Sequence, residues 1–282
     1  MWLSDEWKDY EVIDTSSGEK LERWGKYILV RPDPQVIWST PKNHPLWRKY
    51  DAKYSRSNTG GGKWSNLRLP EQWQVHYKEL TFNVKPMNFK HTGVFPEQAA
   101  NWDFAMEKIR TAGRPISVLN LFAYTGTATC YAADGGAKFT TTVDLSRPSL
   151  DWARRNMARN GFTGPEHEFV QADVIQWVSE QRHTRNRWDL VFCDVPTFSN
   201  SQRMKKSSWD VQRDHSELII GVSRLLTRNG CAIFSCNLRG FKPDVEALQK
   251  AGVVIEDITA STIPEDFKRN AKIHHAYIVR RG

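Results

Sequence analysis

Apolar residues along the last two thirds of the chain fall into short runs, separated by segments with the spacing of amphipathic helices. The run at 188–193 is nearly all apolar, which is typical of a central strand covered on both faces. The predicted strands are 118–122, 140–144, 169–172, 188–193 and 231–236, with two late candidates at 253–258 and 276–279. Strands that alternate with helices predict a parallel sheet with helices on both faces.

The predicted helices lie between these strands. Ser146 is the expected N-cap of a helix that begins near Arg147, has Pro148 in its first turn and stops at Gly161. Its inward positions are Leu150, Trp152, Ala153 and Met157. A second helix is predicted at 174–180. A third, amphipathic helix is predicted from Leu218, Val222, Leu225 and Leu226.

The first 84 residues differ in composition from the rest. They hold seven of the 12 tryptophans and many turn-forming residues. Mixed β-branched and aromatic residues predict short strands here, for instance at 24–30 and 74–84. The sequence therefore predicts a small, mainly β N-terminal region at 1–84 and an α/β domain at 85–282.

Basic residues outnumber acidic ones by 40 to 32, which gives a formal net charge of +8. A basic cluster lies between Lys42 and Arg68, with Asp51 as its only acid. It comprises Lys42, Arg48, Lys49, Lys53, Arg56, Lys63 and Arg68, interleaved with Trp47, Tyr50, Tyr54 and Trp64. Basic groups neutralise phosphates and aromatic rings stack on unpaired bases, so the cluster suits RNA. The alternative is a solvated face over a small Trp-rich core.

Membrane, metal and disulfide proteins are not indicated. No run approaches the 18 or more apolar residues of a membrane span, and the acids near the N-terminus are unlike a signal peptide. The four cysteines, Cys130, Cys193, Cys231 and Cys236, form no CxxC pair and no metal-ligand spacing with the histidines. We therefore expect a cytoplasmic protein without metal or membrane contact. Cys193 and His215 are expected to be structural.

Polar residues follow four successive predicted strands. Residues 120–126 run off the first strand into a turn, Asp144 ends the second, Asp173 the third and Asp194 the fourth. Ligands of open parallel sheets lie beyond these strand ends, where a carboxylate after the second strand accepts hydrogen bonds from ribose hydroxyls. NAD is the competing cofactor, but its fingerprint needs three glycines and only Gly126 is present. S-adenosylmethionine (SAM), which has no phosphate, is therefore favoured.

At these residues the sequence resembles the bacterial large-subunit rRNA methyltransferases, especially the guanine-N7 methyltransferase half of the bifunctional 23S rRNA enzyme. The matching stretches are Leu119-Asn-Leu-Phe-Ala-Tyr-Thr-Gly-Thr-Ala128, Gly135-Gly-Ala, Thr140-Thr-Thr-Val-Asp144, Gln171-Ala-Asp173, Pro196-Thr-Phe-Ser-Asn-Ser201, Arg203-Met204, Asp210-Val-Gln-Arg-Asp-His215, Arg239-Gly-Phe241, Asp266-Phe and Arg269-Asn270. Upstream, Thr92-Gly-Val-Phe95 and Pro96-Glu-Gln98 resemble the family segment that covers the SAM pocket. Residues 1–84 match only loosely.

The resemblance implies a Rossmann-like, seven-stranded SAM-methyltransferase sheet whose last strand is antiparallel. It also implies methyl transfer to a base of structured RNA, with 23S rRNA favoured. The expected cofactor-binding residues are Phe95, Gln98, Asn120, Phe122, Ala123, Tyr124, Thr125, Gly126, Asp144, Leu145, Ser146, Ala172, Asp173, Val174 and Asp194. Asp194 and the Pro196 carbonyl are expected to accept hydrogen bonds from the base, and Phe198 to stack on it.

Two departures from the family pattern leave the acceptor atom open. Val195 replaces the first proline of Asp-Pro-Pro-Thr, and Cys236-Asn237 replaces the Asn-Asn of the guanine-N7 enzymes. A Ser-Cys pair is the motif of the cytosine-C5 rRNA methyltransferases, in which a thiolate adds to C6 of the base. Guanine N7 has a lone pair and needs no covalent help, so N7 is favoured and Cys236 is expected to be a buried apolar residue. Cys236 stays the candidate nucleophile for the C5 alternative.

Two further alternatives belong to other functional classes. A methyltransferase acting on a small molecule or protein would leave the basic cluster without a role. A non-catalytic RNA-binding protein would have little reason to retain Asp144, Asp173 and Asp194 together.

Overall fold

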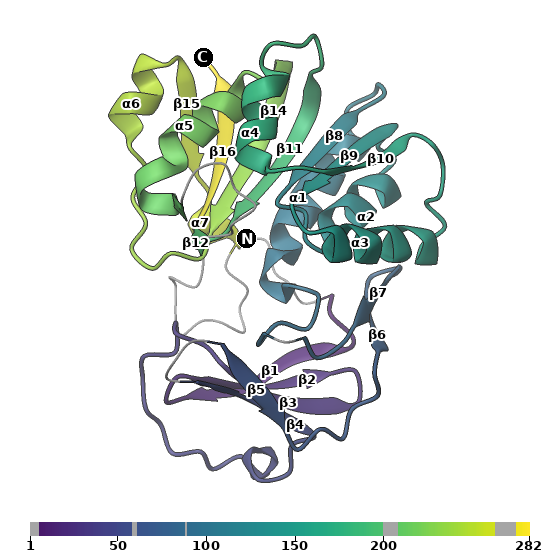
Figure 1. The fold of residues 1–282 in the computed structure, drawn as a ribbon, viewed down its shortest axis with the longest axis vertical. Helices are drawn as coiled ribbons and strands as arrows, with labels where there is room; N and C mark the ends of the chain where they lie inside the picture. The colour runs from purple at the N-terminus through teal and green to yellow at the C-terminus, as the bar shows by residue number, and fades with distance from the viewer. Residues whose placement is uncertain (1–5, 58–60, 88, 200–207, 263–274) are drawn as a thin grey trace. The chain divides into compact units, whose positions relative to one another are not determined.

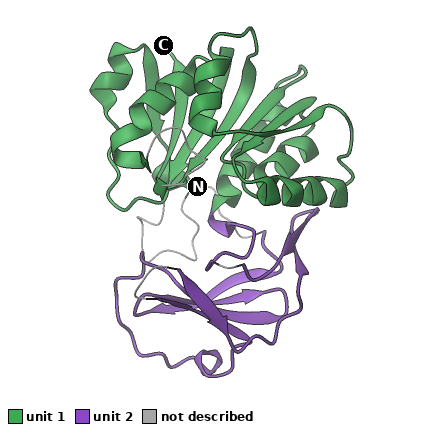
Figure 2. Ribbon diagram, viewed as in Figure 1, with its two compact units in different colours: residues 1, 98–263, 274–282 green, residues 2–97, 264–273 purple. Residues whose placement is uncertain are grey.

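The computed structural model describes residues 6–57, 61–87, 89–199, 208–262 and 275–282. These residues form two compact units that divide between Glu97 and Gln98 (Figure 2). The N-terminal unit contains strands β1 to β7, and the C-terminal unit contains β8 to β16 (Figure 1). The sequence-based boundary lies at the end of β7 (Leu80–Val84), and the segment from there to residue 97 groups with the N-terminal unit.

The N-terminal unit is built on a five-stranded sheet in sequence order. Its strands are β1 (Tyr10–Ser16), β2 (Glu19–Trp24), β3 (Tyr27–Pro32), β4 (Ala52–Arg56) and β5 (Gly62–Ser65). β3 and β4 pair in parallel, and the other neighbours pair antiparallel. The short helix η1 (Pro45–Trp47) precedes β4, and the hairpin of β6 (Trp73–Tyr77) and β7 follows β5. Leu21, Trp24 and Leu29 are fully buried.

The predicted strand at 74–84 is two strands, β6 and β7, joined by a tight turn. The predicted strand at 24–30 begins at the last residue of β2 and, after a tight turn, continues in β3. The chain reverses at Gly25, with a φ of 64°, and at Lys78, with a φ of 50°. The prediction of one strand over 74–84 was wrong, whereas the prediction at 24–30 is confirmed for residues 27–30 and wrong only in its start. In both places strand-forming residues continue on both sides of the turn. Lys78 and Glu79 are also not the Asn-Gly or Asp-Gly pair that marks a hairpin turn.

The C-terminal unit is built on a seven-stranded sheet in the order β10-β9-β8-β11-β14-β16-β15. Its strands are β8 (Ser117–Leu121), β9 (Phe139–Asp144), β10 (His167–Gln171), β11 (Trp188–Val195), β14 (Leu226–Cys236), β15 (Val253–Asp257) and β16 (His275–Arg281). β10, β9, β8, β11 and β14 pair in parallel, whereas β16 is antiparallel to both of its neighbours. The predicted seven-stranded sheet with an antiparallel last strand is confirmed.

Helices cover this sheet in two groups (Figure 1). The described helices are α1 (Ala99–Arg110), α2 (Thr127–Asp134), α3 (Arg147–Arg159), α4 (Val174–Gln181), α5 (Val211–Ser223), α6 (Val245–Lys250) and α7 (Thr259–Thr262), and a short helix η2 (Pro96–Gln98) precedes α1. α2 packs on both α1 and α3, and α5 packs on both α4 and α6. Ser146 caps α3 and a proline occupies its first turn, as predicted.

The third predicted helix is shorter than expected. α5 ends at Ser223, and Leu226 is already the first residue of β14, so the prediction that Leu225 and Leu226 belong to the helix was wrong. Both leucines are buried. The turn between α5 and β14 packs into the same core as Leu218. Its two leucines therefore have the spacing of a helix without belonging to one.

The chain order of the sheet reverses beside β8. From β8 the chain first adds β9 and β10 on one side, and then adds β11 on the other side of β8. Such a reversal is the switch point at which open α/β sheets bind ligands, beyond the carboxyl ends of the strands. The loops that follow β8 and β11 therefore lie at the expected ligand position.

Candidate active site

The loop after β8 is bent by three residues with left-handed backbone angles. φ is 54° at Phe122, 50° at Tyr124 and 72° at Gly126. Gly126 is also required for packing, because an added Cβ would lie 2.7 Å from the Cβ of Ala153 in α3. Non-glycine residues rarely adopt such angles, and they concentrate at ligand-binding sites. The loop thus presents its backbone at the switch point.

Asp144 ties this loop to the loop after β9. Its Oδ2 accepts a hydrogen bond from the Tyr124 amide at 2.9 Å, and its Oδ1 accepts one from the Ser146 amide at 2.7 Å. Burial raises the pKa of Asp144 above its ordinary value. Each carboxylate oxygen can accept more than one hydrogen bond. The carboxylate therefore holds two loops together and keeps capacity to bind hydroxyl donors.

Two residues of the expected cofactor set support the loop from inside. Asn120 is buried and donates from Nδ2 to Thr129 Oγ1 at 2.9 Å, and Thr129 pairs with Thr142 Oγ1 at the same distance. The buried Thr125 accepts at its carbonyl a hydrogen bond from Asn156 Nδ2 at 2.9 Å. These bonds connect β8, α2, β9 and α3 behind the loop.

The loop after β10 continues the same row of strand ends. Asp173 caps α4, since its Oδ1 accepts hydrogen bonds from the amides of Ile175 at 3.0 Å and Gln176 at 3.4 Å. The Ala172 amide donates to the Asp144 carbonyl at 3.1 Å. Val174 is buried, whereas Ala172 is half-buried, as is Leu145 in the neighbouring loop. Three successive strand ends are therefore linked by hydrogen bonds.

Asp194, near the end of β11, lies in a network of side chains. Its Oδ1 accepts hydrogen bonds from Ser235 Oγ at 2.6 Å and from Gln98 Nε2 at 3.0 Å. Asn101 Nδ2 in turn donates to Gln98 Oε1 at 2.7 Å. Neither Ser235 nor Asn101 was predicted to be a site residue. Ser235 could have been found from the parallel register of β11 and β14, which places it opposite Asp194.

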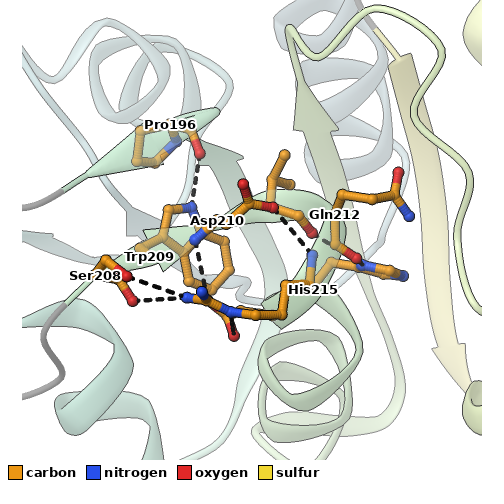
Figure 3. Close-up of polar contacts among 9 residues, drawn as sticks. Pro196, Ser208, Trp209, Asp210, Gln212 and His215 are labelled. Carbon is orange, nitrogen blue, oxygen red and sulfur yellow. Dashed lines mark hydrogen bonds and ion pairs between the residues drawn. The ribbon is translucent and has the colours of Figure 1, made fainter.

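The turn after Asp194 is held by the residues that lead into α5. Trp209 Nε1 donates to the Pro196 carbonyl at 2.7 Å (Figure 3). The Val211 amide donates to the Thr197 carbonyl at 3.1 Å. β12 (Phe198–Ser199) pairs antiparallel with β13 (Trp209–Asp210). The Phe198 side chain is 57% exposed although its backbone is paired. A fixed backbone with an exposed ring suits stacking against a planar ligand.

The segment around Trp209 is itself anchored. Arg213 donates to the Ser208 carbonyl at 2.9 Å and forms an ion pair with Asp214 at 2.7 Å. Asp210 caps α5 by accepting the Arg213 amide at 3.1 Å (Figure 3). The buried Trp209 ring also contacts the ring of Phe122, with centroids 6.3 Å apart. One tryptophan thus touches both the β8 loop and the β11 turn.

The remaining candidates have the structural environments expected for them. His215 is buried, and its Nδ1 lies 2.9 Å from the Val211 carbonyl (Figure 3). Its Nε2 accepts a hydrogen bond from the Asp244 amide at 2.9 Å. Cys193 is buried in β11. Cys236 is fully buried, and burial raises the pKa of its thiol to about 12. A thiol with this pKa stays protonated at neutral pH.

Phe95 is the one expected cofactor residue that belongs to the N-terminal unit. There its ring packs edge-on against His91, with centroids 5.0 Å apart. The other members of the expected set, from Gln98 to Asp194, belong to the C-terminal unit.

The residues of the basic cluster in the N-terminal unit differ in burial and in ion pairing. Trp47 and Tyr54 are buried, and Trp47 Nε1 donates to Asp14 at 2.7 Å, so the interpretation of these two rings as base-stacking groups was wrong. They fill the core, as the alternative interpretation held for this Trp-rich region. Lys42 and Lys53 both form ion pairs with Glu19 at 2.6 Å. The exposed cations are Arg48, Lys49, Arg56, Lys63 and Arg68.

No group of three or more His, Cys, Asp or Glu side chains in the described ranges could hold a metal ion. No helix among the described elements is long and apolar enough to cross a membrane.

The chain is similar in sequence to known methyltransferases. A family model described as S-adenosylmethionine-dependent methyltransferase matches residues 46–253. "Ribosomal RNA large subunit methyltransferase K/L" of Alteromonas mediterranea is 37% identical over 97% of this chain and 37% of its own length. The protein of the same name from Shewanella frigidimarina is 43% identical over 70% of this chain and 27% of its own. The chain therefore spans less than half the length of these relatives.

Solved structures share the fold over nearly the whole chain. The SAM-dependent methyltransferase from Agrobacterium tumefaciens has a TM-score of 0.83 and 24% identity, covering 98% of this chain and 90% of its own. The protein SMU.776 complexed with SAH has a TM-score of 0.74 and 18% identity, covering 98% and 76%.

Proposed function

The chain belongs to the S-adenosylmethionine-dependent methyltransferase family, and on that premise we propose that it methylates a base of large-subunit ribosomal RNA, with guanine N7 as the acceptor. The observation that carries the proposal is the pairing of two loops at the switch point. One loop, after β8, is hydrogen-bonded to Asp144 at the end of β9, a carboxylate suited to ribose hydroxyls, and the other, after β11, carries an exposed aromatic ring. The names of the curated relatives support the RNA substrate.

The loop after β8 and the adjoining Asp144 fit SAM. Asp144 is half-buried and already oriented by two amides, so a ribose can bind without reordering the loop. The single glycine at Gly126 and the absence of a GxGxxG run leave no seat for a pyrophosphate. When bound, SAM supplies a methyl group activated by its cationic sulfonium. The protein's main contribution is then to align the acceptor with that methyl group.

The second loop fits a purine base. Phe198 offers an exposed face for stacking, while Asp194 and the Pro196 carbonyl offer acceptors for the N–H groups of guanine. Trp209 occupies one acceptor position of the Pro196 carbonyl, and a carbonyl oxygen has two. Guanine N7 carries an available lone pair, so positioning suffices for its attack.

The cytosine-C5 alternative requires a thiolate in the base pocket. Cys236 is fully buried, and burial raises the pKa of its thiol to about 12. Both observations support a packing role for Cys236 and favour guanine N7.

A direct assay tests the proposal. Purified protein is incubated with SAM and large-subunit rRNA from a strain lacking its gene, and the product is mapped by mass spectrometry. We expect one N7-methylated guanine. Methylation of no RNA, with transfer to a small molecule or protein instead, would reject the proposed substrate.

Two variants separate the chemistries. Cys236→Ala should leave the methylation rate within about tenfold and lower stability only modestly, because the side chain only packs. Asp194→Ala should lose far more activity, because it removes an acceptor at the base and disturbs the network with Gln98 and Ser235. Rates are measured by methyl incorporation. A covalent adduct between Cys236 and RNA containing 5-fluorocytosine would instead establish the C5 chemistry.

A further inference from the structure

An exposed aromatic ring lies in the N-terminal unit outside the basic cluster. Phe89 is 61% exposed, whereas Trp47 and Tyr54 of the cluster are buried. Exposing a phenylalanine forgoes the favourable burial of a large apolar surface. The proposed chemistry of the C-terminal unit does not use this ring.

The backbone that carries Phe89 is fixed. Trp64 Nε1 donates to the Met87 carbonyl at 2.7 Å and lies 3.2 Å from the Phe89 carbonyl. The ring of Trp64 packs edge-on against the buried Tyr54, with centroids 5.4 Å apart. The Lys85 amide also donates to the Thr92 carbonyl at 3.0 Å. Phe89 is therefore held against β5 while its side chain faces solvent.

Cations accompany the ring. Arg56 ends β4 two residues after Tyr54, so strand alternation places it on the same face of the sheet as Tyr54 and its cross-strand partner Trp64. Lys90 follows Phe89 directly. Its ammonium group donates to the Pro32 carbonyl at 3.4 Å. Burial and neighbouring cations, Arg56 among them, together lower the pKa of Lys90 to about 8, and the carboxylate of Asp33 acts in the opposite direction. Within the described residues, no carboxylate forms a salt bridge with Arg56 or Lys90.

We propose that Phe89, Arg56 and Lys90 form a binding site for an unpaired nucleotide of RNA. The base would stack on the Phe89 ring, and the phosphates would contact Arg56 and Lys90, because single-stranded RNA is bound by just this combination of aromatic faces and cations. This proposal rests on the proposed function, since it takes RNA as the substrate. It adds a contact with an unpaired base in the N-terminal unit.

Binding to two RNA probes tests the stacking. One probe is a fluorescein-labelled hairpin with a seven-nucleotide adenine loop, and the other is a blunt duplex of the same stem. Phe89→Ala should weaken hairpin binding by about tenfold and leave duplex binding unchanged, because a lost stack costs on the order of 1–3 kcal/mol per base. Phe89→Trp should restore hairpin binding. Phe139→Ala, at a phenylalanine that is 51% exposed in the C-terminal unit, is the matched control.

The salt dependence of the same titrations separates the two kinds of contact. Arg56→Gln should reduce the slope of log affinity against log salt by about one unit, whereas Phe89→Ala should leave the slope unchanged. Equal loss on hairpin and duplex, or no loss with Phe89→Ala, would overturn the nucleotide site. If the wild type binds and methylates rRNA in either case, the proposed function stands and only this site fails. If the wild type neither binds nor methylates any RNA, both fail.

Discussion

At Gly126 a single hydrogen atom in place of a side chain allows the β8 loop to approach α3. The residue has a φ of 72°, and an added Cβ would lie 2.7 Å from the Ala153 Cβ. We expect Gly126→Ala to destabilise the protein by about 2 kcal/mol or more, through overpacking and backbone strain together, and to weaken SAM binding. Thermal unfolding and calorimetry measure the two effects.

Gly136 provides the matched control for this variant. Its φ is 92°, but no atom lies within 4 Å of an added Cβ. Gly136→Ala therefore adds backbone strain alone, on the order of 1 kcal/mol, and should leave SAM affinity unchanged. Equal effects of the two substitutions would show that contact with Ala153 does not matter.

We expect Asp144 to make SAM binding depend on pH. Burial raises the pKa of this carboxyl group, so folding disfavours its ionised form, and its contribution to folding stability is present at low pH and lost as pH rises through the folded pKa. Ribose binding has the opposite dependence, because the ionised carboxylate is the stronger acceptor. SAM affinity should thus fall on acidification at a higher pH than an ordinary aspartate would give.

The Asp144→Asn variant isolates this effect. We expect weaker SAM binding by about 1–3 kcal/mol at neutral pH, because the charged acceptor is lost. The acid-dependent fall in affinity should disappear with it. Calorimetric titrations from pH 5 to pH 8 provide the measurement, and a variant with unchanged affinity would reject Asp144 as the ribose ligand.

Residues at strand ends could be predicted from the sequence, but their partners could not. Asp144, Asp173 and Asp194 each come at the end of a short run rich in strand-forming residues, so their positions depend only on local pattern. Ser235 reaches Asp194 through the register between β11 and β14, and no local pattern fixes that register.

At the scale of elements, the short ladder of β12 and β13 connects the turn after Asp194 to the loop after β8. Trp209 donates to the Pro196 carbonyl at 2.7 Å and contacts Phe122. Trp209→Phe keeps a ring but removes the indole N–H. We expect the KM for RNA to rise about fivefold to tenfold, since a buried hydrogen bond contributes about 1 kcal/mol and its loss frees the turn. SAM affinity should stay within about twofold.

Trp188→Phe is the matched control for Trp209→Phe. Trp188 is also buried, and its Nε1 donates to Thr141 Oγ1 at 3.3 Å, away from both loops. Steady-state kinetics with rRNA and calorimetry with SAM compare the two variants. A rise in KM of the same size in both would mean that Trp209 acts only through stability.

Strands of the sheet could be predicted more readily than the helices around it. A central strand such as β11 is apolar at every position except Asp189 and Asp194. α2 escaped prediction because all five residues from Ala128 to Ala132 are buried, which leaves no polar face and no helical period. The hairpin of β6 and β7 escaped because its turn carries no turn-forming residue.

At the scale of the whole molecule, charge and packing divide the basic cluster. Its net charge and composition were visible in the sequence, but the neutralisation of Lys42 and Lys53 by Glu19 was not, because Glu19 lies in β2, well before the cluster. Burial likewise assigns Trp47 and Tyr54 to the core. The exposed cations that remain are therefore the ones to test for phosphate contact.

We expect replacement of the exposed Arg48, Lys49 and Arg56 by glutamine to weaken rRNA binding and to reduce its salt slope by about one unit per lost phosphate contact. The double replacement Lys42→Gln and Lys53→Gln should change the slope less, because both side chains already pair with Glu19 at 2.6 Å, and should instead lower the stability of the N-terminal unit by removing that pairing. Binding titrations between 50 and 200 mM salt, together with thermal unfolding, distinguish the two. Equal slopes for both variants and the wild type would return the cluster to a solvated face, because a surface that contacts phosphates must release counterions when RNA binds.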